Sequence, residues 1–594
     1  MDTNEKLSCL RKVMKEQGVN AYIIPSSDPH MSEYVSEHWK SRQYFSGFTG
    51  SAGTLVVTDS ESGLWTDGRY YIQAANELTN SEVILFKIGE KNVPSYIEYL
   101  LKNLKPSQVV GIDGRLFSAS TVQSMKALLD KRSIGMKVNL DLVTPIWKDR
   151  PKAPLTEVYI HDVCYTGLTT KEKIQKVREV MAVKQVDGYV MSELASIAWL
   201  FNIRANDIDY NPMAVAYAYI TREHAYLCID GSRMPINVSM ELKNQGVQVR
   251  KYEDIDKLLK GILEPSKVLC HTSTINYHLY RLLDKNLSVK IIEDEDIVIH
   301  LKAIKNEVEI QNIKEAHIKD GCALVHFMIE FEKRLLEDEI LTEYDVIEML
   351  RKARRKQIHN KGESFGSIVG YKENAAMMHY APTKEKYKQL KREGLLLIDS
   401  GGQYLEGTTD ITRTFALGSV QEEQKKHYTL VLKAHIGMAK AIFMEGCTGG
   451  NLDILARAPI WAHGLDYKCG TGHGVGFMLG VHEGPQSLRM TNNTIFKKGM
   501  LITDEPGIYI KDSHGIRTEN ILLVKDYKKT LNGVFYQFEV ITYFPIDTVP
   551  IEKNLLTIDE VKWLNDYNQM VYDKLSPRLN GEALNWLKEH TKEI

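Results

Sequence analysis

Five residues in the C-terminal half of the chain have types and spacing that could hold metal ions. Four are carboxylates near the ends of short strand-like segments, and the fifth is a histidine in a glycine-rich run. They are Asp399, Asp410, His473, Glu505 and Glu519. Carboxylate oxygens and one imidazole form a hard ligand set that suits two divalent cations such as Mn²⁺, with Co²⁺ or Zn²⁺ as alternatives. Four negative charges balance two M²⁺ ions, so the neutral site could also hold a bridging hydroxide.

The first two carboxylates lie on segments that we expect to pair as strands. Leu395–Ile398 is a continuous apolar run, typical of a buried strand, and it ends at Asp399. In the next segment, TTDITRTF, alternation places Asp410 and Thr412 on one face. An antiparallel pair would bring the two carboxylates together. Because like charges repel, one would stay protonated unless a cation lay between them.

The histidine lies in Gly470–Gly476, where four glycines alternate with other residues. A phosphate-binding loop is the obvious alternative, but neither of the usual phosphate-loop motifs occurs in this stretch. We expect the glycines to let the backbone approach another segment closely while His473 points into a site.

The last two carboxylates also belong to strand-like segments. Pro506 should hold Glu505 in an extended conformation at the end of Met500–Asp504. In Gly515–Val524, alternation puts Arg517 and Glu519 on one face. Taken singly, any of the five residues is better explained by a surface salt bridge or a turn. Taken together, they favour a metal site.

Composition excludes several classes of protein. Hydrophobic residues make up 43% and charged residues 26% of the 594 residues, which is ordinary for a folded soluble protein. Lys+Arg (75) and Asp+Glu (77) nearly cancel, so we expect no nucleic-acid partner. The N-terminus lacks a signal-peptide core and no apolar run reaches membrane-spanning length, so we expect no membrane association. Seven scattered cysteines without a C-x-x-C pair favour reduced thiols and a cytoplasmic location.

A weak internal repeat suggests how the N-terminal half is organised. Leu10–Ile24 and Val177–Met191 share five identical positions at a constant offset, and each looks like a helix followed by a short strand. Strands are also expected at Thr54–Thr58 and around Leu64–Ile72. A proline-rich stretch at Pro145–Pro154 marks a boundary. We therefore predict two related α/β domains, residues 1–154 and 155–305.

The third domain should comprise residues 306–594. A long amphipathic helix is expected to start near Asn306. Near the C-terminus, Thr557 and Glu560 form a capping box ahead of a helix whose apolar face should pack on this domain or on a second subunit. Residues from about 545 onward would form a helical extension. Lys302 and Lys305 form a small basic cluster near the domain junction, to which we assign no function.

Four motifs in this region resemble the pita-bread metallopeptidases, a family that includes methionine aminopeptidase, prolidase, creatinase and aminopeptidase P. They are IDSGGQYLEGTTDITRTF, GTGHGVGFMLGVHEGP, DEPGIYI and GIRTENILLV. The resemblance is strongest to the long, three-domain cytosolic aminopeptidase P group and extends to the N-terminal half through SGFTGSAGTLVVT, WTDGRYYIQAA and FNIRANDIDYNP. It implies two creatinase N-terminal-like α/β domains followed by a pita-bread domain, a mixed α/β and α+β architecture.

The resemblance also implies roles for individual residues. Asp410 and Glu519 would bridge two metals, Asp399 would bind one of them, and His473 with Glu505 the other. The resemblance also implies that His379 contacts the substrate near the scissile bond, that His482 steadies the tetrahedral intermediate and that Arg69 binds the peptide. Tyr509 and Arg517 would orient the metal ligands.

Three of these assignments have ordinary structural alternatives. His379 and His482 could be partly buried, hydrogen-bonded histidines, and Arg69 could form an ion pair with Asp67 in a turn.

The implied activity is removal of the N-terminal residue from peptides with proline in the second position. A hydroxide bridging two metals would attack, His482 would stabilise the oxyanion and Glu505 would move the proton. Relatives are often homodimers. Two alternatives remain: a prolidase-type X-Pro dipeptidase, which shares the five ligands, and a non-catalytic pita-bread binding protein, which should have lost them.

Overall fold

The computed structural model describes residues 1–337 and 339–594. Contacts within the chain divide it into two compact units. Unit 1 comprises residues 1–160 and 168–298, and unit 2 comprises residues 161–167 and 299–594. All five predicted metal ligands belong to unit 2.

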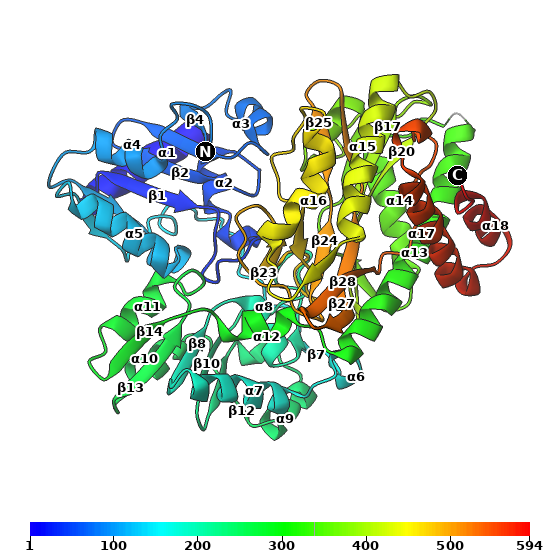
Figure 1. Ribbon diagram of the computed structural model, residues 1–594. Helices are drawn as coiled ribbons and strands as arrows, with labels where there is room; N and C mark the ends of the chain where they lie inside the picture. The colour runs from blue at the N-terminus through cyan, green and yellow to red at the C-terminus, as the bar shows by residue number, and fades with distance from the viewer. Residues whose placement is uncertain (338) are drawn as a thin grey trace. The chain divides into compact units, whose positions relative to one another are not determined.

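Unit 1 contains two six-stranded sheets that share one topology (Figure 1). The first has the order β4 (Val83–Lys87), β3 (Ser62–Thr66), β2 (Thr54–Thr58), β1 (Ala21–Pro25), β5 (Val109–Gly111), β6 (Gly135–Lys137). The second has the order β12 (Val247–Arg250), β11 (Ala225–Cys228), β10 (Tyr217–Thr221), β8 (Gly188–Met191), β13 (Ser266–Cys270), β14 (Val289–Glu293). In both sheets the fourth strand is antiparallel to the third and parallel to the fifth.

The sequence repeat occupies the same place in both sheets. Helix α1 (Thr3–Glu16) precedes β1, and helix α7 (Thr170–Val183) precedes β8. Each helix begins with a capping box, from Asp2 in the first copy and from Thr169 in the second. Each also buries apolar side chains one and two turns apart on one face, as an amphipathic helix against a sheet must. The repeat is thus a helix–strand unit that folds twice.

One predicted strand of unit 1 is wrong in its second half. The strand expected around Leu64–Ile72 ends at Thr66, and helix α3 (Tyr71–Glu77) begins five residues later. Asp67 causes the break, because its carboxylate accepts hydrogen bonds from the backbone N–H of Arg69 (3.1 Å) and from the Arg69 side chain. A short acidic side chain that captures a nearby backbone N–H favours a turn over a strand.

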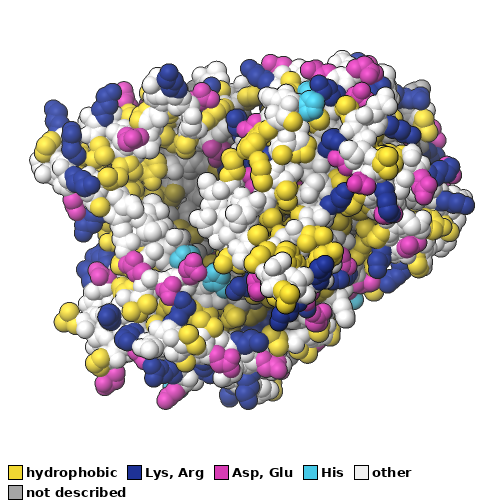
Figure 2. Space-filling view, in the orientation of Figure 1, with side chains coloured by type: hydrophobic (Ala, Val, Ile, Leu, Met, Phe, Trp, Pro, Cys, Tyr) yellow, Lys and Arg dark blue, Asp and Glu magenta, His cyan; other side chains and the backbone are white. Residues whose placement is uncertain are grey.

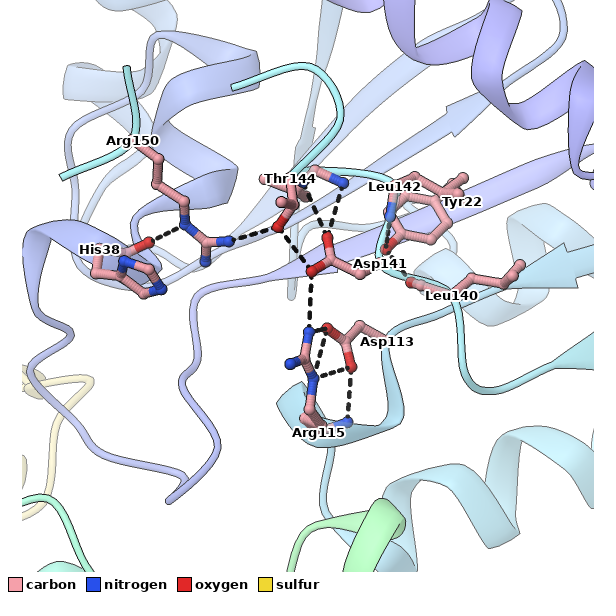
Figure 3. Close-up of polar contacts among 10 residues, drawn as sticks. Tyr22, His38, Asp113, Arg115, Leu140, Asp141, Leu142, Thr144 and Arg150 are labelled. Carbon is pink, nitrogen blue, oxygen red and sulfur yellow. Dashed lines mark hydrogen bonds and ion pairs between the residues drawn. The ribbon is translucent and has the colours of Figure 1, made fainter. Parts of the chain in front are cut away.

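The segment that follows β6 is fixed by a polar network, which Figure 3 shows. Asp141 accepts hydrogen bonds from the backbone and hydroxyl of Thr144 and from Arg115, which also pairs with Asp113. Arg150 donates from Nε to the His38 carbonyl (2.6 Å). The chain is therefore tied to the first sheet's surroundings as far as Arg150, inside the proline-rich stretch.

Unit 2 is built from two pairs of packed helices around several small sheets (Figure 1). The pairs are α13 (Glu307–Leu336) with α14 (Glu343–Arg355), and α15 (Glu422–Ala439) with α16 (Gly449–Trp461). Asn306 caps α13 by accepting hydrogen bonds from the backbone N–H groups of Val308 and Glu309, which confirms the expected helix start.

Two sheets of unit 2 position the predicted carboxylate ligands. One has the order β16 (Ile368–Tyr371), β17 (Leu395–Ser400), β20 (Ile411–Ala416); the other has the order β21 (Ile442–Met444), β28 (Gly533–Val540), β27 (Asn520–Thr530), β24 (Leu501–Asp504). Two short hairpins join β22 (Gly472–Gly474) to β23 (Glu483–Leu488), and β25 (Gly507–Ile510) to β26 (His514–Arg517). The stretch Gly515–Val524, expected to be one strand, is divided between β26 and β27.

The C-terminal tail is helical, as its capping box predicted. Helix α17 (Ile558–Leu575) starts at Thr557, whose side chain accepts a hydrogen bond from the backbone N–H of Glu560, and helix α18 (Gly581–His590) follows. In Figure 1 both lie beside α13. The apolar face of α17 is buried within unit 2, through Leu564, Tyr567, Val571 and Leu575.

The surface of the described residues carries both signs of charge. On the face that Figure 2 shows, Lys and Arg side chains are interspersed with Asp and Glu side chains. Among the described helices, none combines the length and the apolar character needed to cross a membrane.

Candidate metal centre

Strands β17 and β20 bring the first two carboxylates together. The two strands are antiparallel, with Asp399 opposite Thr412, which confirms the predicted pairing. Asp410 immediately precedes β20 and lies two residues before Thr412, on the same face of the strand. Both carboxylates are buried. The apolar residues of β17 explain why, because they place the strand inside the core of unit 2.

The third and fourth carboxylates flank a second strand pair. In β24 and β27, Asp504 lies opposite Asn520, so Glu505 follows one strand where Glu519 precedes the other. Glu519 lies in the break between β26 and β27, where its backbone N–H donates to the Thr412 carbonyl (3.1 Å). The Thr412 hydroxyl donates to Glu519 Oε2 (2.8 Å). These two hydrogen bonds attach Glu519 to Thr412 of β20, the strand that follows Asp410.

His473 enters the centre from the glycine-rich run, as the sequence suggested. A Cβ atom on Gly472 would lie 1.8 Å from the Thr503 carbonyl oxygen, so only glycine permits this close approach. The backbone N–H of His473 donates to the Thr503 hydroxyl (2.9 Å). Its Nδ1 lies 3.0 Å from the Gly474 carbonyl, which requires the proton on Nδ1. Nε2 is left with a lone pair, 3.5 Å from Asp410 Oδ2 and 3.4 Å from Glu505 Oε1.

The electrostatics of the centre favour a bound cation. Burial raises the pKa of Asp410 and of Glu519 well above the usual range, and the neighbouring carboxylates raise both further. Burial also raises the pKa of Glu505 to about 7 and lowers the pKa of His473. These carboxylates therefore repel one another and hold protons that a cation would displace.

The donor geometry also fits metal binding. One ligand atom each from Asp410, His473 and Glu519 lies within 4.8 Å of the other two. Glu505 lies beside this group, with its Oε1 3.4 Å from His473 Nε2. The Oδ1 atom of Asp399 is buried without a hydrogen-bond partner in the described part of the chain, as expected for an oxygen reserved for a ligand. The residues present thus suit hard divalent cations.

Arg517 connects the centre to its surroundings. Its guanidinium donates to Asp399 Oδ2 (2.6 Å), to the Tyr509 hydroxyl (2.6 Å) and to the Thr412 hydroxyl (3.1 Å). Asp399 is thereby held by one oxygen while its other oxygen stays available. The structure brings Tyr509 and Arg517 together with the ligands, as expected for residues that orient them.

The other predicted residues lie in different settings. His482 is exposed, and its ring stands perpendicular to that of His473 with centroids 4.3 Å apart. His379 is exposed in a turn after the short helix η4 (Lys372–Ala376). Arg69 belongs to unit 1, where it pairs with Asp67 (2.7 Å). The ion pair expected as the alternative for Arg69 is therefore present.

The sequence offered little sign of two features of this region. One is the pair of hydroxyls, Thr412 and Thr503, that bond Glu519, Glu505 and the His473 backbone. The other is Glu483, which is buried between the ammonium groups of Lys302 and Lys305. Strand alternation places Thr412 on the same face as Asp410, but it does not show that the Thr412 hydroxyl bonds Glu519. Glu483 gave no comparable signal, because its partners lie far away in sequence.

The chain matches four family descriptions in sequence. Two are creatinase/prolidase N-terminal domains, at residues 6–139 and 149–309. The others are metallopeptidase family M24 at residues 311–526 and the C-terminal region of peptidase M24 at residues 534–594. The four matches cover nearly the whole chain.

Similar proteins share its full length. Aminopeptidase P2 of Arabidopsis thaliana is 38% identical over 632 residues, covering 100% of this chain and 88% of that protein. The crystal structure of X-prolyl aminopeptidase from Caenorhabditis elegans, described as a cytosolic enzyme with a di-nuclear active site, matches with a TM-score of 0.94 and 33% identity, covering 100% of both chains. An Xaa-Pro dipeptidase from Bacillus anthracis matches with a TM-score of 0.51 and 25% identity, covering 64% of this chain and 99% of that one.

Proposed function

Because the chain belongs to metallopeptidase family M24, with creatinase-type N-terminal domains and a pita-bread catalytic domain, we propose that it is a metal-dependent Xaa-Pro aminopeptidase. Such an enzyme releases the N-terminal residue from peptides that carry proline in the second position. The observation that carries this proposal is the cluster of Asp410, His473 and Glu519, with Glu505 beside His473, in unit 2 of a chain whose full-length relatives have this activity by name. The two N-terminal domains are proposed to span residues 1–154 and 155–305, and the catalytic domain residues 306–594.

We propose that two divalent cations, Mn²⁺ in our assignment, are held by Asp399, Asp410, His473, Glu505 and Glu519. When bound, these cations would supply Lewis acidity, which lowers the pKa of water and polarises a carbonyl group. Asp410 and Glu519 would each serve both cations, Asp399 would serve one, and His473 with Glu505 the other. The lone pair left on His473 Nε2 and the free oxygen of Asp399 support this assignment.

The chain's own groups have distinct tasks in hydrolysis. Glu505, whose Oε1 lies 3.4 Å from His473 Nε2, is proposed to carry a proton from the attacking water to the leaving nitrogen. That nitrogen belongs to proline, whose tertiary amide has no N–H, so it must receive a proton as it leaves. His482, exposed beside His473, is proposed to stabilise the oxyanion.

We propose that two further residues contact the substrate. His379 would lie near the scissile bond, and Arg69 would bind the peptide.

Two variants test these substrate contacts. His482→Ala should lower kcat and retain bound metal, and Arg69→Ala should raise KM with little change in kcat. Unchanged kinetics in either variant would remove that residue from the site.

One assay tests the activity. Purified protein should cleave X-Pro-Y tripeptides when Mn²⁺ is present, lose this activity to a chelator, and regain it when Mn²⁺ is restored. Cleavage of X-Pro dipeptides alone would instead identify the prolidase-type alternative. Binding without cleavage would point to the non-catalytic alternative, which the intact ligand set disfavours.

Two variants test the ligand assignment. Asp410→Asn and Glu519→Gln each keep the shape of the side chain and remove a charge, so both should abolish hydrolysis and reduce the metal content. Metal content can be measured on the purified proteins by atomic emission. Full activity in either variant would contradict a two-metal centre.

We also propose a cytoplasmic homodimer. The location is supported by the worm relative, which is described as cytosolic, and by seven cysteines that are all free thiols. The dimer rests on family resemblance and can be checked by light scattering coupled to size-exclusion chromatography. A monomer at micromolar concentration would contradict it.

A further inference from the structure

A buried polar network lies behind the strands that carry the proposed metal ligands. Side chains alternate along a strand, so the neighbour of a ligand points away from the centre. Asn520 follows Glu519, Asp504 precedes Glu505, and Arg413 follows Thr412, the residue that bonds Glu519. Asn520, Asp504 and Arg413 are at most 3% exposed. Three strands therefore present polar groups to the same interior region.

Arg413 is the centre of this network. Its guanidinium carries five N–H groups and lies within hydrogen-bond distance of six neutral oxygen atoms, so the two N–H groups of Nη2 are shared among three acceptors. The acceptors are the carbonyl oxygens of Thr412 (2.9 Å), Glu519 (2.6 Å), Phe544 (2.7 Å) and Pro545 (3.0 Å), Asn520 Oδ1 (2.9 Å) and the Tyr567 hydroxyl (2.8 Å). Three acceptors belong to Glu519, its neighbour Asn520 and Thr412, and three come from residues 544–567. A buried cation is tolerated only when its donors are satisfied, so this geometry is tightly determined.

The network continues from Arg413 to the third strand in one direction. Arg413 can only donate, so Asn520 Oδ1 accepts and Asn520 Nδ2 must donate to His435 Nε2, 2.9 Å away. With Nε2 as an acceptor, the His435 proton lies on Nδ1, which donates to the Asp504 backbone carbonyl (3.2 Å). The same Nδ1 lies 2.9 Å from Asp504 Oδ2. His435 is completely buried on α15. Aligned hydrogen bonds of this kind strengthen one another.

Tyr567 ties the C-terminal extension to this chain of contacts. The residue lies on α17, accepts from Arg413 and donates to the Phe544 carbonyl (2.7 Å). Its ring stacks on Trp563 with centroids 5.4 Å apart, so packing holds the ring in place independently of the hydroxyl. The hydroxyl can therefore be removed without removing the side chain.

We propose that Tyr567, Arg413, Asn520 and His435 are positioning residues through which the C-terminal extension sets the arrangement of the metal ligands. Arg413 fixes the backbone of Glu519 relative to β20, and His435 fixes Asp504, and hence Glu505, relative to β27. The extension thus supports the metal ligands without contacting the reacting atoms. This inference rests on the proposed function, because it assigns the ligands to a metal centre.

The experiment compares two tyrosine hydroxyls. Tyr567→Phe removes the hydroxyl that contacts Arg413. The matched control is Tyr428→Phe, because Tyr428 is also buried and its hydroxyl donates to a backbone carbonyl of the same segment, that of Asp547 (2.6 Å). For each variant, the Mn²⁺ dissociation constant, kcat, KM and the melting temperature would be measured.

Both variants should lose some thermal stability. Only Tyr567→Phe should weaken Mn²⁺ binding, by about 10-fold, as is usual when a residue that supports metal ligands is changed. It should also lower kcat at saturating Mn²⁺ with KM unchanged. Unaltered Mn²⁺ affinity and kcat in Tyr567→Phe would overturn the proposal, as would equal losses in Tyr428→Phe.

A double variant tests whether the contacts act as one network. Combining Tyr567→Phe with His435→Gln should change Mn²⁺ affinity by less than the sum of the separate effects, because both interrupt the same chain of hydrogen bonds. Fully additive losses of Mn²⁺ affinity would contradict a connection between Tyr567 and His435. Wild-type protein that binds Mn²⁺ but leaves X-Pro peptides uncut would refute the proposed function alone, since the affinity comparison would still decide the positioning role.

Discussion

At the residue scale, Arg517 shows how one side chain can hold both a ligand and its neighbours. Its three donor groups reach Asp399, Tyr509 and Thr412, and Thr412 in turn bonds Glu519. A planar guanidinium supplies these donors at fixed angles, which the single ammonium of lysine cannot do. Charge and geometry at this position can therefore be separated by experiment.

We expect Arg517→Lys to keep the positive charge and lose the three-way geometry. Mn²⁺ affinity should fall by about 10- to 100-fold, as for other residues that support metal ligands, and kcat should fall with it. Isothermal titration calorimetry and steady-state kinetics would measure both quantities. Arg354→Lys is the control: Arg354 is equally buried and forms a two-point contact with Asp320, so its variant should lose stability while metal affinity is retained. Wild-type affinity in Arg517→Lys would contradict this role.

At the element scale, strand β23 is fixed by a buried ion cluster. Glu483 at its start lies between Lys302, at 3.1 Å, and Lys305, and all three side chains are at most 2% exposed. Glu483 also pairs across the hairpin with Gly474, beside His473. Lys302 and Lys305, which had no assigned function, thus hold the hairpin that carries His473.

The cluster predicts a large loss of stability for Glu483→Gln. The change leaves two buried ammonium groups without the carboxylate between them, which typically destabilises a protein by about 3–5 kcal/mol. Urea unfolding would measure the loss. The control is Asp566→Asn, which breaks an exposed pair with Lys562 on α17 and should have no measurable effect. Comparable small effects in both variants would show that the cluster does not stabilise the hairpin.

A buried histidine on helix α13, His317, should make the stability of the protein depend on pH. Burial lowers the pKa of His317 to about 4, although Asp320 opposes the shift. The folded pKa lies below the unfolded value of about 6.5, so the unfolded state binds more protons between these values. The free energy of unfolding should therefore fall as the pH drops from about 6.5 to 4, by up to about 1.4 kcal/mol per pH unit from this residue.

Chemical unfolding at several pH values tests this expectation. The His317→Gln variant lacks the titrating group and should show a shallower pH dependence than the wild type. The exposed His326 lies on the same helix, and His326→Gln should behave like the wild type. Identical slopes for His317→Gln and wild type would exclude His317 as a source of acid sensitivity.

At the scale of the whole molecule, the chain forms two compact units, and the candidate centre belongs entirely to unit 2. A ligand that binds only the folded form stabilises the unit that holds it, by about 2.7 kcal/mol at a free concentration 100 times its dissociation constant. Metal binding should therefore stabilise unit 2 selectively.

Differential scanning calorimetry of the full chain can detect this selectivity. Addition of Mn²⁺ to chelator-treated protein should raise the melting temperature of one transition and leave the other unchanged. The Asp410→Asn variant should show a smaller rise, because it lacks one carboxylate of the centre. Equal shifts of both transitions, or a single transition that moves as a whole, would contradict independent stabilisation of unit 2.

Local patterns in the sequence predicted much of this protein. They located the helix that starts after Asn306, the capped α17, the antiparallel pairing of the strands that bring Asp399 and Asp410 together, and the repeat that became two matching sheets. Each depends on near neighbours, through helix capping, side-chain alternation or glycine geometry, so a short stretch contains the necessary information. The same locality produced the errors, because alternation continued through breaks at Asp67 and Glu519 that hydrogen bonds impose.

Only the tertiary structure decided which distant groups meet. Lys305 and Glu483 lie 178 residues apart in sequence, and Arg413 and Tyr567 lie 154 apart, yet both pairs are in direct contact. Such contacts depend on how strands pair and how helices pack over the whole unit, and the balance of burial, desolvation and chain entropy that selects this packing is not present in any single segment. The sequence therefore determined which residues could bind metal, and the fold determined which residues hold them in place.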